Sequence, residues 1–325
     1  LLCAFDGFTF LRSNTKMTSL GAKTSKSSQC VMSKKGVRYF DSDFEFSELL
    51  EIGLAFDRKI VEMSEDDVSK EVEDVSKEEE EEEAYGEVWE KFHVTMGSKF
   101  FPRKRYVPLA FPEIGGEDEK KGKRRRVFAL GCGTGSSILA ILKYWDHVHV
   151  GCVDVSRKAV DVFLKRCKEE DLSSRVLDAE VFDLVGEATV PRSILSHVPY
   201  DVFTLIFVLS AIRPKDHVRV LQRARTLGPK GLLCFRDYGL YDMTMLRSKK
   251  HQVVKVEDAK GPPRLFRRAD GTLRYFFSLD YVRSVFKRAG WDCVRMDYSR
   301  VVNKNRRTGQ ELRRVFVTAV FRART

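Results

Sequence analysis

The stretch Val127-Phe128-Ala129-Leu130-Gly131-Cys132-Gly133-Thr134-Gly135 decides the fold of this 325-residue chain. Its four apolar residues predict a short buried strand, and its three glycines predict a tight loop at the carboxyl end of that strand. A glycine loop lets backbone N–H groups approach a ligand closely, and a helix that begins there adds a dipole. The stretch therefore predicts a cofactor site at the end of a strand in an α/β sheet.

Strands and helices alternate after this loop. Further strands are expected at residues 148–153, 176–182, 202–209 and 231–235, with helices at 136–144, 157–169, 215–227 and 279–289. This alternation predicts parallel β-α-β units and a doubly wound, Rossmann-like α/β sheet. Residues 291–302 and 314–321 follow without a helix between them, so they are expected to add a terminal antiparallel hairpin.

Two acidic residues follow the next two strands. Asp154 ends the second strand, where a carboxylate can bind the two hydroxyls of a ribose, and Asp183 ends the third, where it can accept from an adenine amino group. Capping of the helix that begins at Arg157 is the alternative role for Asp154. A GxGxG loop with both acids is the arrangement used for S-adenosylmethionine. It differs from the GxGxxG motif of dinucleotide sites, which disfavours a nicotinamide-dependent oxidoreductase.

A second polar cluster follows the apolar run 232–234. The residues Phe235-Arg236-Asp237-Tyr238-Gly239-Leu240-Tyr241-Asp242 bring an arginine, a carboxylate and a tyrosine to the end of a strand. Open α/β sheets bind ligands beyond their strand ends, so this cluster suits a planar polar substrate. A structural ion pair between Arg236 and Asp237 is the alternative. The next segment, 247–274, is strongly basic and contains Asp270-Gly271, which predicts a hairpin turn.

The formal net charge of +11 is divided unevenly along the chain. Residues 62–83 carry a net charge of −11, so the rest of the chain carries +22. This excess of cations favours a polyanionic partner, because Lys and Arg placed along phosphates release counterions. A well-solvated surface is the alternative explanation.

Residues 1–84 are expected to form a disordered, low-complexity extension, and residues 85–325 the folded domain. Residues 1–38 are rich in Ser, Thr, Lys and Arg, which is typical of an organelle-targeting presequence or of a plain disordered tail. Residues 40–62 hold a weakly amphipathic stretch that is a candidate helix. Cytoplasm is the expected compartment, with a mitochondrion or another organelle as the alternative.

The seven cysteines occur singly, without the spacing of a metal site or a disulfide framework. They are expected to be reduced thiols, and no metal is expected. No apolar run reaches the length of a membrane span, so no membrane partner is expected either.

An aromatic and basic segment, residues 85–125, precedes the first strand of the domain. Its side chains suit a lid that covers a cofactor and also touches RNA. Packing of its aromatic rings onto the core is the alternative. The residues concerned are Trp89, Phe92, His93, Phe100, Phe101, Arg103, Lys104, Arg105 and Tyr106.

Residues 85–325 resemble the eukaryotic tRNA N3-methylcytidine methyltransferases of the methyltransferase-like family. The matching blocks are Trp89 to Phe92, Phe100-Phe101, Gly131 to Gly135, Leu205-Ile206-Phe207-Val208-Leu209-Ser210-Ala211, Phe235 to Asp242, Met245-Leu246-Arg247, Asp270-Gly271-Thr272, Tyr275-Phe276-Phe277, Val302-Asn303-Lys304 and Arg314-Val315-Phe316. The resemblance implies a class I methyltransferase fold, S-adenosylmethionine as cofactor and no metal. It further implies methylation of cytidine N3 at position 32 of the tRNA anticodon loop. For some members it also implies a partner, either seryl-tRNA synthetase or another tRNA-modifying protein.

Roles for individual residues follow from this resemblance. Asp237 is expected to accept from the exocyclic amine of the cytosine, Arg236 to hold its carbonyl oxygen or a phosphate, and Tyr238 to stack on the flipped base. The methyl donor is expected to contact Trp89, His93, Gly131, Cys132, Gly133, Gly135, Asp154, Asp183, Leu184 and Phe207. The RNA is expected to contact Phe100, Phe101, Lys104, Arg105, Arg247, Lys249, Lys250, Arg267, Arg268 and Tyr275.

The chain departs from the family pattern at four positions. Ser136 stands where the family usually has asparagine, and His93 where it usually has tyrosine. Lys104 and Tyr106 stand where arginine and tryptophan are common. Two other functions stay open at this point: methylation of a small molecule or protein, and tRNA binding by a module with an inactive cofactor pocket.

Overall fold

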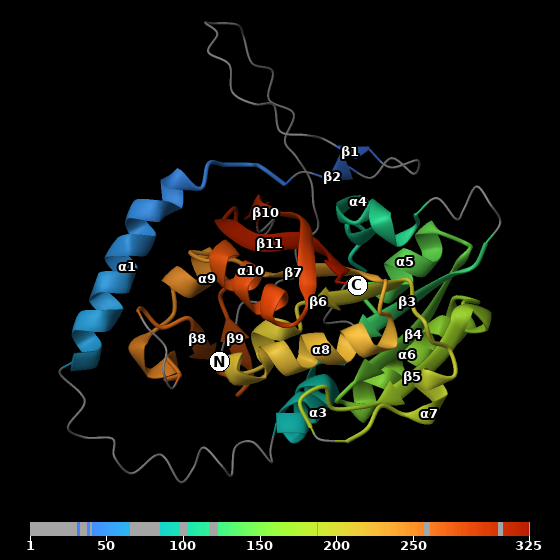
Figure 1. The fold of residues 1–325 in the computed structure, drawn as a ribbon. Coiled ribbons are helices and arrows are strands. Elements are labelled where there is room, and N and C mark those ends of the chain that lie inside the picture. Colours follow the sequence, from blue (N-terminus) through green and yellow to red (C-terminus); the bar gives the residue numbers. More distant parts are fainter. Residues whose placement is uncertain are drawn as a thin grey trace, which may run out of the picture.

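A seven-stranded sheet lies at the centre of the computed structural model (Figure 1). The structure describes residues 31–32, 38–39, 41–65, 85–97, 103–116, 123–186, 188–256, 261–304 and 308–324. From one edge to the other, its strands are β10 (Trp291–Lys304), β11 (Glu311–Ala323), β7 (Leu232–Tyr238), β6 (Val202–Ile206), β3 (Arg125–Leu130), β4 (Val148–Asp154) and β5 (Val176–Val181). β10 and β11 pair antiparallel, as do β11 and β7, whereas the other neighbours are parallel. The doubly wound sheet with a terminal antiparallel hairpin is confirmed.

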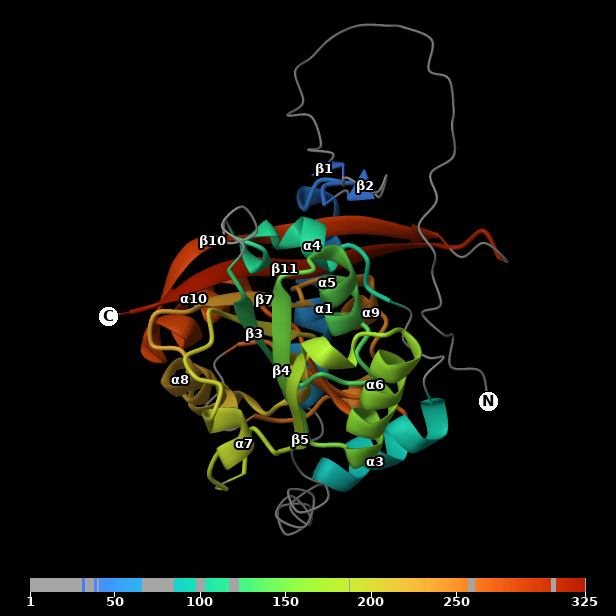
Figure 2. The same ribbon diagram turned by 90° about the vertical axis from the view of Figure 1, so that its right-hand side faces the viewer.

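Helices cover both faces of this sheet (Figure 2). One face packs against α4 (Val107–Ala110), α5 (Ile138–Tyr144) and α6 (Arg157–Glu169). The other face packs against α8 (His217–Leu227) and α10 (Leu279–Arg288). α10 shows how the sequence produces this packing: Val282, Val285 and Phe286 share one buried stripe, and the Ser278 side chain caps the helix by accepting from the N–H of Tyr281.

The fourth expected strand, 202–209, is shorter in the structure than the sequence predicted. β6 ends at Ile206, because Phe207 adopts a left-handed backbone with φ of 59°. The N–H of Phe207 still donates to the carbonyl of Arg236 at 2.8 Å. A 3₁₀ turn, η5 (Leu209–Ala211), follows at once and turns the chain across the carboxyl end of the sheet. The run 202–209 is apolar apart from Thr204, so the sequence pattern does not show this change of direction.

Shorter elements complete the described part of the chain. The helices are α3 (Tyr85–Met96), α7 (Arg192–Leu195) and α9 (Met243–Leu246). Two strand pairs lie outside the main sheet: β1 (Val31–Met32) with β2 (Arg38–Tyr39), and β8 (Leu265–Arg267) with β9 (Leu273–Tyr275). The other 3₁₀ turns are η2 (Pro112–Ile114), η4 (Ser173–Arg175), η6 (Pro214–Asp216) and η7 (Lys250–Gln252). The hairpin turn predicted at Asp270-Gly271 is confirmed, because Gly271 joins β8 to β9 with φ of 83°. None of these described helices is both long and apolar enough to cross a bilayer.

The N-terminal helix α1 (Ser47–Glu65) confirms the candidate helix at 40–62, with both ends further along the chain. It lies within the stretch for which the sequence predicts a mostly disordered extension. In the structure, Phe44 and Leu49 are buried in a hydrophobic cluster that also contains Tyr241 and Phe276. The helix lies beside α9 (Figure 1), and apolar burial accounts for its place on the domain.

Candidate active site

A cavity of about 330 Å³ opens at the carboxyl ends of the parallel strands. Its lining residues form two groups that differ in chemistry, and we name each group after its residues. The glycine wall consists of Trp89, His93, Gly131, Cys132, Gly133, Asp154, Asp183 and Leu184. The cation wall consists of Lys104, Phe207, Arg236, Tyr238, Arg268, Arg274, Asn303, Arg314 and Phe316.

The glycine loop after β3 contributes Gly131, Cys132 and Gly133 to the glycine wall. Gly131, Gly133 and Gly135 have φ of 72°, 50° and 82°, a backbone region that favours glycine. A Cβ on Gly133 would meet no atom within 4 Å, so this residue opens into the cavity. A Cβ on Gly135 would lie 2.4 Å from the ring of Phe163. Gly135, expected to contact the donor, instead lies outside the cavity lining and packs against α6.

Asp154 fixes this loop to the end of β4. One of its carboxylate oxygens accepts from the N–H of Gly133 at 2.7 Å, and the other accepts from the N–H of Ser156 at 3.0 Å. Burial raises the pKa of Asp154, although both hydrogen bonds oppose the rise. Ser156, not Asp154, caps helix α6, because Ser156 Oγ accepts from the N–H of Ala159. The carboxylate of Asp154 thus lines the cavity.

Helix α3 brings Trp89 and His93 over this carboxylate. The side chain of Glu90 accepts from Ser156 Oγ at 2.6 Å and from the N–H of Lys158 at 3.1 Å, which anchors α3 at the start of α6. His93 is buried, and its Nδ1 has no hydrogen-bond partner within the described residues. Burial lowers the pKa of His93, against the opposing influence of Asp154 and Glu90. A buried nitrogen left in this position fits a polar group of a bound ligand.

The other side of the glycine wall comes from the end of β5. Asp183 and Leu184 both line the cavity, as expected for donor contacts. One oxygen of Asp183 accepts from the N–H of Val185 at 2.8 Å, which orients the carboxylate. Cys132 also lines the cavity, and its N–H donates to the carbonyl of Val153 at 2.9 Å.

The cation wall is a set of arginine and lysine side chains over aromatic rings. Lys104 Nζ lies 4.5 Å from the centre of the Phe207 ring. The guanidinium of Arg274 lies 4.5 Å from the ring centre of Tyr238, and that of Arg236 lies 4.9 Å from the ring centre of Phe316. Cation–π contacts of this kind hold both partners in place. Burial lowers the pKa of Lys104 to about 8, against the opposing charge of Asp237.

The three residues proposed for catalysis alternate along β7. Arg236 and Tyr238 line the cavity, whereas Asp237 does not, because successive side chains of a strand point to opposite faces. Asp237 has no exposed surface and accepts from the N–H groups of Ser210 and Tyr238, each at 2.9 Å. Burial raises its pKa to about 6.

The recorded hydrogen bonds of Arg236 run to β10 and β11. The guanidinium of Arg236 donates to Thr318 Oγ1 at 2.5 Å and to Ser299 Oγ at 3.1 Å. Arg236 thus donates to side chains of β10 and β11, whereas Asp237 accepts from main-chain N–H groups. Asp237 is not among the residues that line the cavity.

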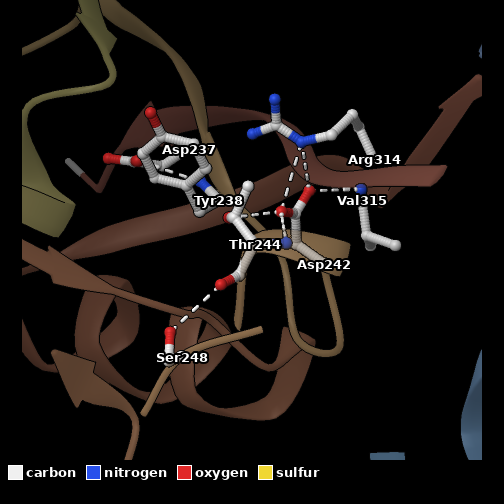
Figure 3. A network of polar contacts seen from close by, with 7 residues as sticks. All are labelled: Asp237, Tyr238, Asp242, Thr244, Ser248, Arg314 and Val315. Carbon is white, nitrogen blue, oxygen red and sulfur yellow. Dashed lines mark hydrogen bonds and ion pairs between the residues drawn. The ribbon is translucent and has the colours of Figure 1, made fainter. Parts of the chain in front are cut away.

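Arg314 enters the cation wall from β11 and is held by Asp242. Figure 3 shows this network, in which Arg314 Nε donates to Asp242 Oδ2 at 2.8 Å and the N–H of Val315 donates to the same oxygen at 2.9 Å. Thr244 donates to Asp242 Oδ1 from its N–H at 2.8 Å and from its hydroxyl. The Asp242 side chain has no exposed surface, and that of Arg314 is almost fully buried.

The residues expected to contact RNA do not form one continuous group. Lys104 and Arg268 line the cavity. Arg105, Arg247 and Lys249 are exposed on the surface, and Lys250 and Arg267 are half-buried outside the cavity lining. Phe100 and Phe101 lie outside the described residues.

Tyr275 corrects the expectation that it stacks on an RNA base. It is buried in the main core, with its ring centre 5.0 Å from that of Tyr281 and 5.6 Å from that of His217. Phe276 and Phe277 are buried as well. The aromatic run packs the β8–β9 hairpin onto the domain, because three large apolar side chains gain more from burial than from exposure.

Four residues of the cation wall had no role assigned from the sequence: Arg274, Asn303, Arg314 and Phe316. A signal was present for two of them, since Arg314, Phe316 and Thr318 alternate along a predicted strand and so share one face. Arg274 lies in the basic segment, but nothing in the sequence separates it from its basic neighbours there. Asn303 lies in the matching block Val302-Asn303-Lys304, which gave it no individual role.

This arrangement defines what the cavity can bind. Turned glycines, two carboxylates and an unsatisfied imidazole nitrogen suit a nucleoside with hydroxyl and amino groups. Aromatic faces with cations above them suit a planar base and its phosphates. Within the described residues no group of His, Cys, Asp and Glu is arranged to hold a metal ion.

Comparisons with known proteins agree with this chemistry. Residues 128–233 match the model of a methyltransferase domain family. The chain is 33% identical over 245 residues to a tRNA N(3)-methylcytidine methyltransferase of Drosophila melanogaster, covering 72% of this chain and 70% of the relative. It is 27% identical to a tRNA(Thr) (cytosine(32)-N(3))-methyltransferase of Saccharomyces cerevisiae, with 72% of this chain and 36% of the relative covered.

Two further similarities complete the picture. The chain is 34% identical to a Dictyostelium discoideum protein named O-methyltransferase 3, covering 62% of this chain and 44% of the relative. Among solved structures, a SAM-dependent methyltransferase from Anabaena variabilis superimposes with a TM-score of 0.52 at 14% identity, covering 74% of this chain and 95% of the other. The structural likeness concerns the fold alone.

Proposed function

This chain belongs to the family of tRNA N(3)-methylcytidine methyltransferases, and we propose on that basis that it transfers a methyl group from S-adenosylmethionine to N3 of cytidine 32 in the tRNA anticodon loop. One observation carries the proposal: a single cavity joins a glycine wall suited to a nucleoside donor with a cation wall suited to an RNA base. Neither wall alone would distinguish this activity from other methyl transfers.

The residues of the glycine wall fit S-adenosylmethionine, which supplies an electrophilic methyl group on its sulfonium. Asp154 would hold the ribose hydroxyls, and Asp183 with Leu184 would lie against the adenine. Gly133 has open space where a side chain would stand. His93 Nδ1 adds one more polar contact, because no described residue satisfies it. This set holds and orients the donor.

The cation wall would receive the cytosine after it leaves the anticodon stack. The rings of Phe207, Tyr238 and Phe316 line the cavity and offer faces for stacking. Arg236 and Arg314 lie near these rings and bring positive charge to this part of the cavity. An unpaired loop base reaches such a site at a lower energetic cost than a base in a duplex.

The reaction does not require a general base for the target nitrogen. N3 of neutral cytosine carries a lone pair, so positioning of the two reactants supplies most of the rate gain. Positive charge moves onto the base during the transfer. The carboxylate of Asp237 accepts from the N–H groups of Ser210 and Tyr238, two residues that line the cavity, and its field would stabilise that charge.

Methyl transfer to purified tRNA tests this proposal directly. The protein is incubated with a labelled methyl donor and each of three substrate pools: total tRNA, a protein extract and a metabolite extract. We expect N3-methylcytidine in the tRNA alone, and none in a transcript with uridine at position 32. Transfer to metabolites or proteins without transfer to tRNA would favour the alternative class of methyltransferase. Donor binding without any transfer would favour an RNA-binding module.

A partner and a compartment complete the proposal. We propose seryl-tRNA synthetase as the tRNA-bound partner and the cytoplasm as the compartment, on the strength of the family resemblance and the composition of the sequence. Co-purification with and without ribonuclease tests the partner. Fractionation of cells, followed by nucleoside analysis of cytoplasmic and mitochondrial tRNA after depletion of the protein, tests the compartment. Loss of N3-methylcytidine from mitochondrial tRNA alone would contradict a cytoplasmic site of action.

A further inference from the structure

The N-terminal helix α1 is joined to the domain by a buried carboxylate. Asp57 accepts from both terminal nitrogens of Arg264, at 2.6 and 2.8 Å, and from the hydroxyl of Tyr241 at 2.9 Å. Only 7% of the Asp57 surface is exposed. A two-pronged contact between an arginine and a carboxylate fixes the orientation of both groups as well as the distance between them. Asp57 therefore holds Arg264 in one position against α1.

The packing around this pair brings the backbone of α1 close to the domain. A Cβ on Gly53, one turn before Asp57, would lie 2.3 Å from the ring of Tyr241, so a glycine is needed for this approach. Phe56 packs beside Phe266 of β8, with ring centres 6.4 Å apart. Figure 1 shows α1 on the side of the domain that carries α9, β8 and β9. The helix is thus packed against β8 as well as against Tyr241.

Arg264 lies at the base of the β8–β9 hairpin (residues 265–275). It directly precedes β8, and its carbonyl accepts from the N–H of Phe276, just after β9, at 2.9 Å. Each strand of this hairpin has only three residues. A two-stranded ribbon this short has little stability of its own, so its position depends on the surfaces that it contacts. Helix α1 supplies one of those surfaces through the Asp57–Arg264 pair.

The same hairpin reaches the cavity with two arginines, Arg268 and Arg274. The guanidinium carbon of Arg274 lies 4.5 Å from the ring centre of Tyr238, which belongs to the cation wall. The guanidinium carbon of Arg268 lies 5.9 Å from the ring centre of Phe92 on α3, the helix that contributes two residues to the glycine wall. A shift of the hairpin would therefore displace groups that contact both walls.

We propose that Asp57 is a positioning residue for methyl transfer: it holds the base of the hairpin through Arg264, and the hairpin holds Arg268 and Arg274 in place in the cavity. The role rests on the proposed function, since the transfer that it serves takes place in this cavity. Asp57 itself is not among the residues that line the cavity. Its effect on the reaction is therefore carried by the hairpin.

The test compares Asp57→Asn with a matched variant of the same helix, Glu48→Gln. Glu48 also pairs with the domain, at 3.0 Å from Arg313 of β11, but this pair is exposed and lies outside the hairpin. Single-turnover methylation of tRNA is measured at saturating tRNA and donor. Asp57→Asn is expected to lower the rate constant by about 10- to 100-fold, the scale of a misplacement of about 1 Å. Glu48→Gln should keep the wild-type rate constant, and an equal loss in both variants would overturn the proposal.

The amplitude of the same reaction separates positioning from stability. A partly unfolded sample loses amplitude, because fewer molecules react, whereas a misplaced hairpin lowers the rate constant of the folded molecules. Leu172→Ala, a core variant in a different hydrophobic cluster, provides the comparison. It should lower the unfolding temperature and leave the rate constant unchanged. A rate constant that falls as far in Leu172→Ala as in Asp57→Asn would trace the loss to stability and overturn the proposal.

Variants of the hairpin test the route of the effect. In a background with Arg268→Gln and Arg274→Gln, Asp57→Asn should cause little further loss of rate, because all three residues act through one structure. Losses that multiply would show that Asp57 acts independently of the hairpin. Should Asp57→Asn fail to fold, Arg264→Lys decides: it keeps the positive charge beside Asp57 but lacks the two-pronged contact. A wild-type rate constant in Arg264→Lys would overturn the proposal.

The order of the assays separates the positioning role from the proposed function. The wild-type protein is assayed first, and failure to methylate tRNA would contradict the proposed function itself. Methylation by the wild type, together with a wild-type rate constant in Asp57→Asn, would contradict the positioning role alone.

Discussion

The two walls of the cavity are built by different means. The glycine wall comes mainly from loops at three neighbouring strand ends, and backbone geometry sets its shape: turned glycines, and an aspartate that accepts from main-chain N–H groups. The cation wall consists of side chains that are widely separated in the sequence, the first being Lys104 and the last Phe316. Contacts between these side chains set its shape. A single substitution in the glycine wall should therefore cause a large loss of ligand binding. A single substitution in the cation wall should cause only a partial loss.

The largest effect is expected at Asp154. Replacement by alanine removes the acceptor that we propose for two ribose hydroxyls, and it releases the N–H of Gly133 from its partner. Hydrogen bonds to a charged group contribute about 1.5–3 kcal/mol each, so donor affinity should fall by at least about 100-fold. Calorimetric titration with the donor measures this. An unchanged affinity in a folded Asp154→Ala protein would remove Asp154 from the site.

The chemical step should be most sensitive at Asp237. Asp237→Asn keeps the shape but removes the charge, and the loss of one preorganised electrostatic group costs about 100-fold in rate. Binding of tRNA and donor should change far less. Single-turnover kinetics at saturating substrates measure the rate. A near wild-type rate would make Asp237 a structural residue that holds Ser210 and Tyr238 in place.

The pKa of Asp237 gives this prediction a dependence on pH. Burial raises that pKa to about 6. If the ionised form serves the reaction, the rate should rise with pH through about 6 and then level off. The dependence of folding stability on pH runs in the opposite direction. The Asp237 carboxyl binds its proton more tightly in the folded than in the unfolded state, so its contribution to the free energy of unfolding declines as pH rises from about 4 to about 6. Both dependences should disappear in Asp237→Asn.

The same contrast explains what the sequence could predict. The glycine loop, Asp154 and Asp183 follow strands in a fixed order, and α6 begins and ends at the predicted residues. The left-handed backbone of Phe207 and the pairing of Asp242 with Arg314 depend on contacts between residues distant in the chain. The alternation on β7 that turns Asp237 away from the cavity could have been deduced, because it needs only the period of a strand.

Two glycines of the loop should separate binding from folding. Gly135→Ala places a Cβ 2.4 Å from the ring of Phe163, and overpacking of a core typically costs about 1–3 kcal/mol of stability. Gly133→Ala meets no atom within 4 Å, so its cost is mainly that of a non-glycine residue at φ of 50°, about 1–2 kcal/mol. Its added methyl group occupies donor space. Thermal unfolding and donor titration on both variants should show the larger stability loss at Gly135 and the larger affinity loss at Gly133.

The smallest effect is expected outside the cavity, at Arg247 and Lys249. Both are exposed and far less constrained than the cation wall, so they suit phosphates of the RNA backbone. Replacing both with glutamine should flatten the dependence of log affinity on log salt by up to about 0.7–0.9 for each phosphate that the variant no longer neutralises. Donor affinity and the rate at saturating tRNA should not change. A matched variant, Arg283→Gln on the exposed face of α10, tests whether any surface cation has this effect. If it flattens the slope equally, the basic segment has no special part in RNA binding, and the charge of the whole surface attracts the tRNA.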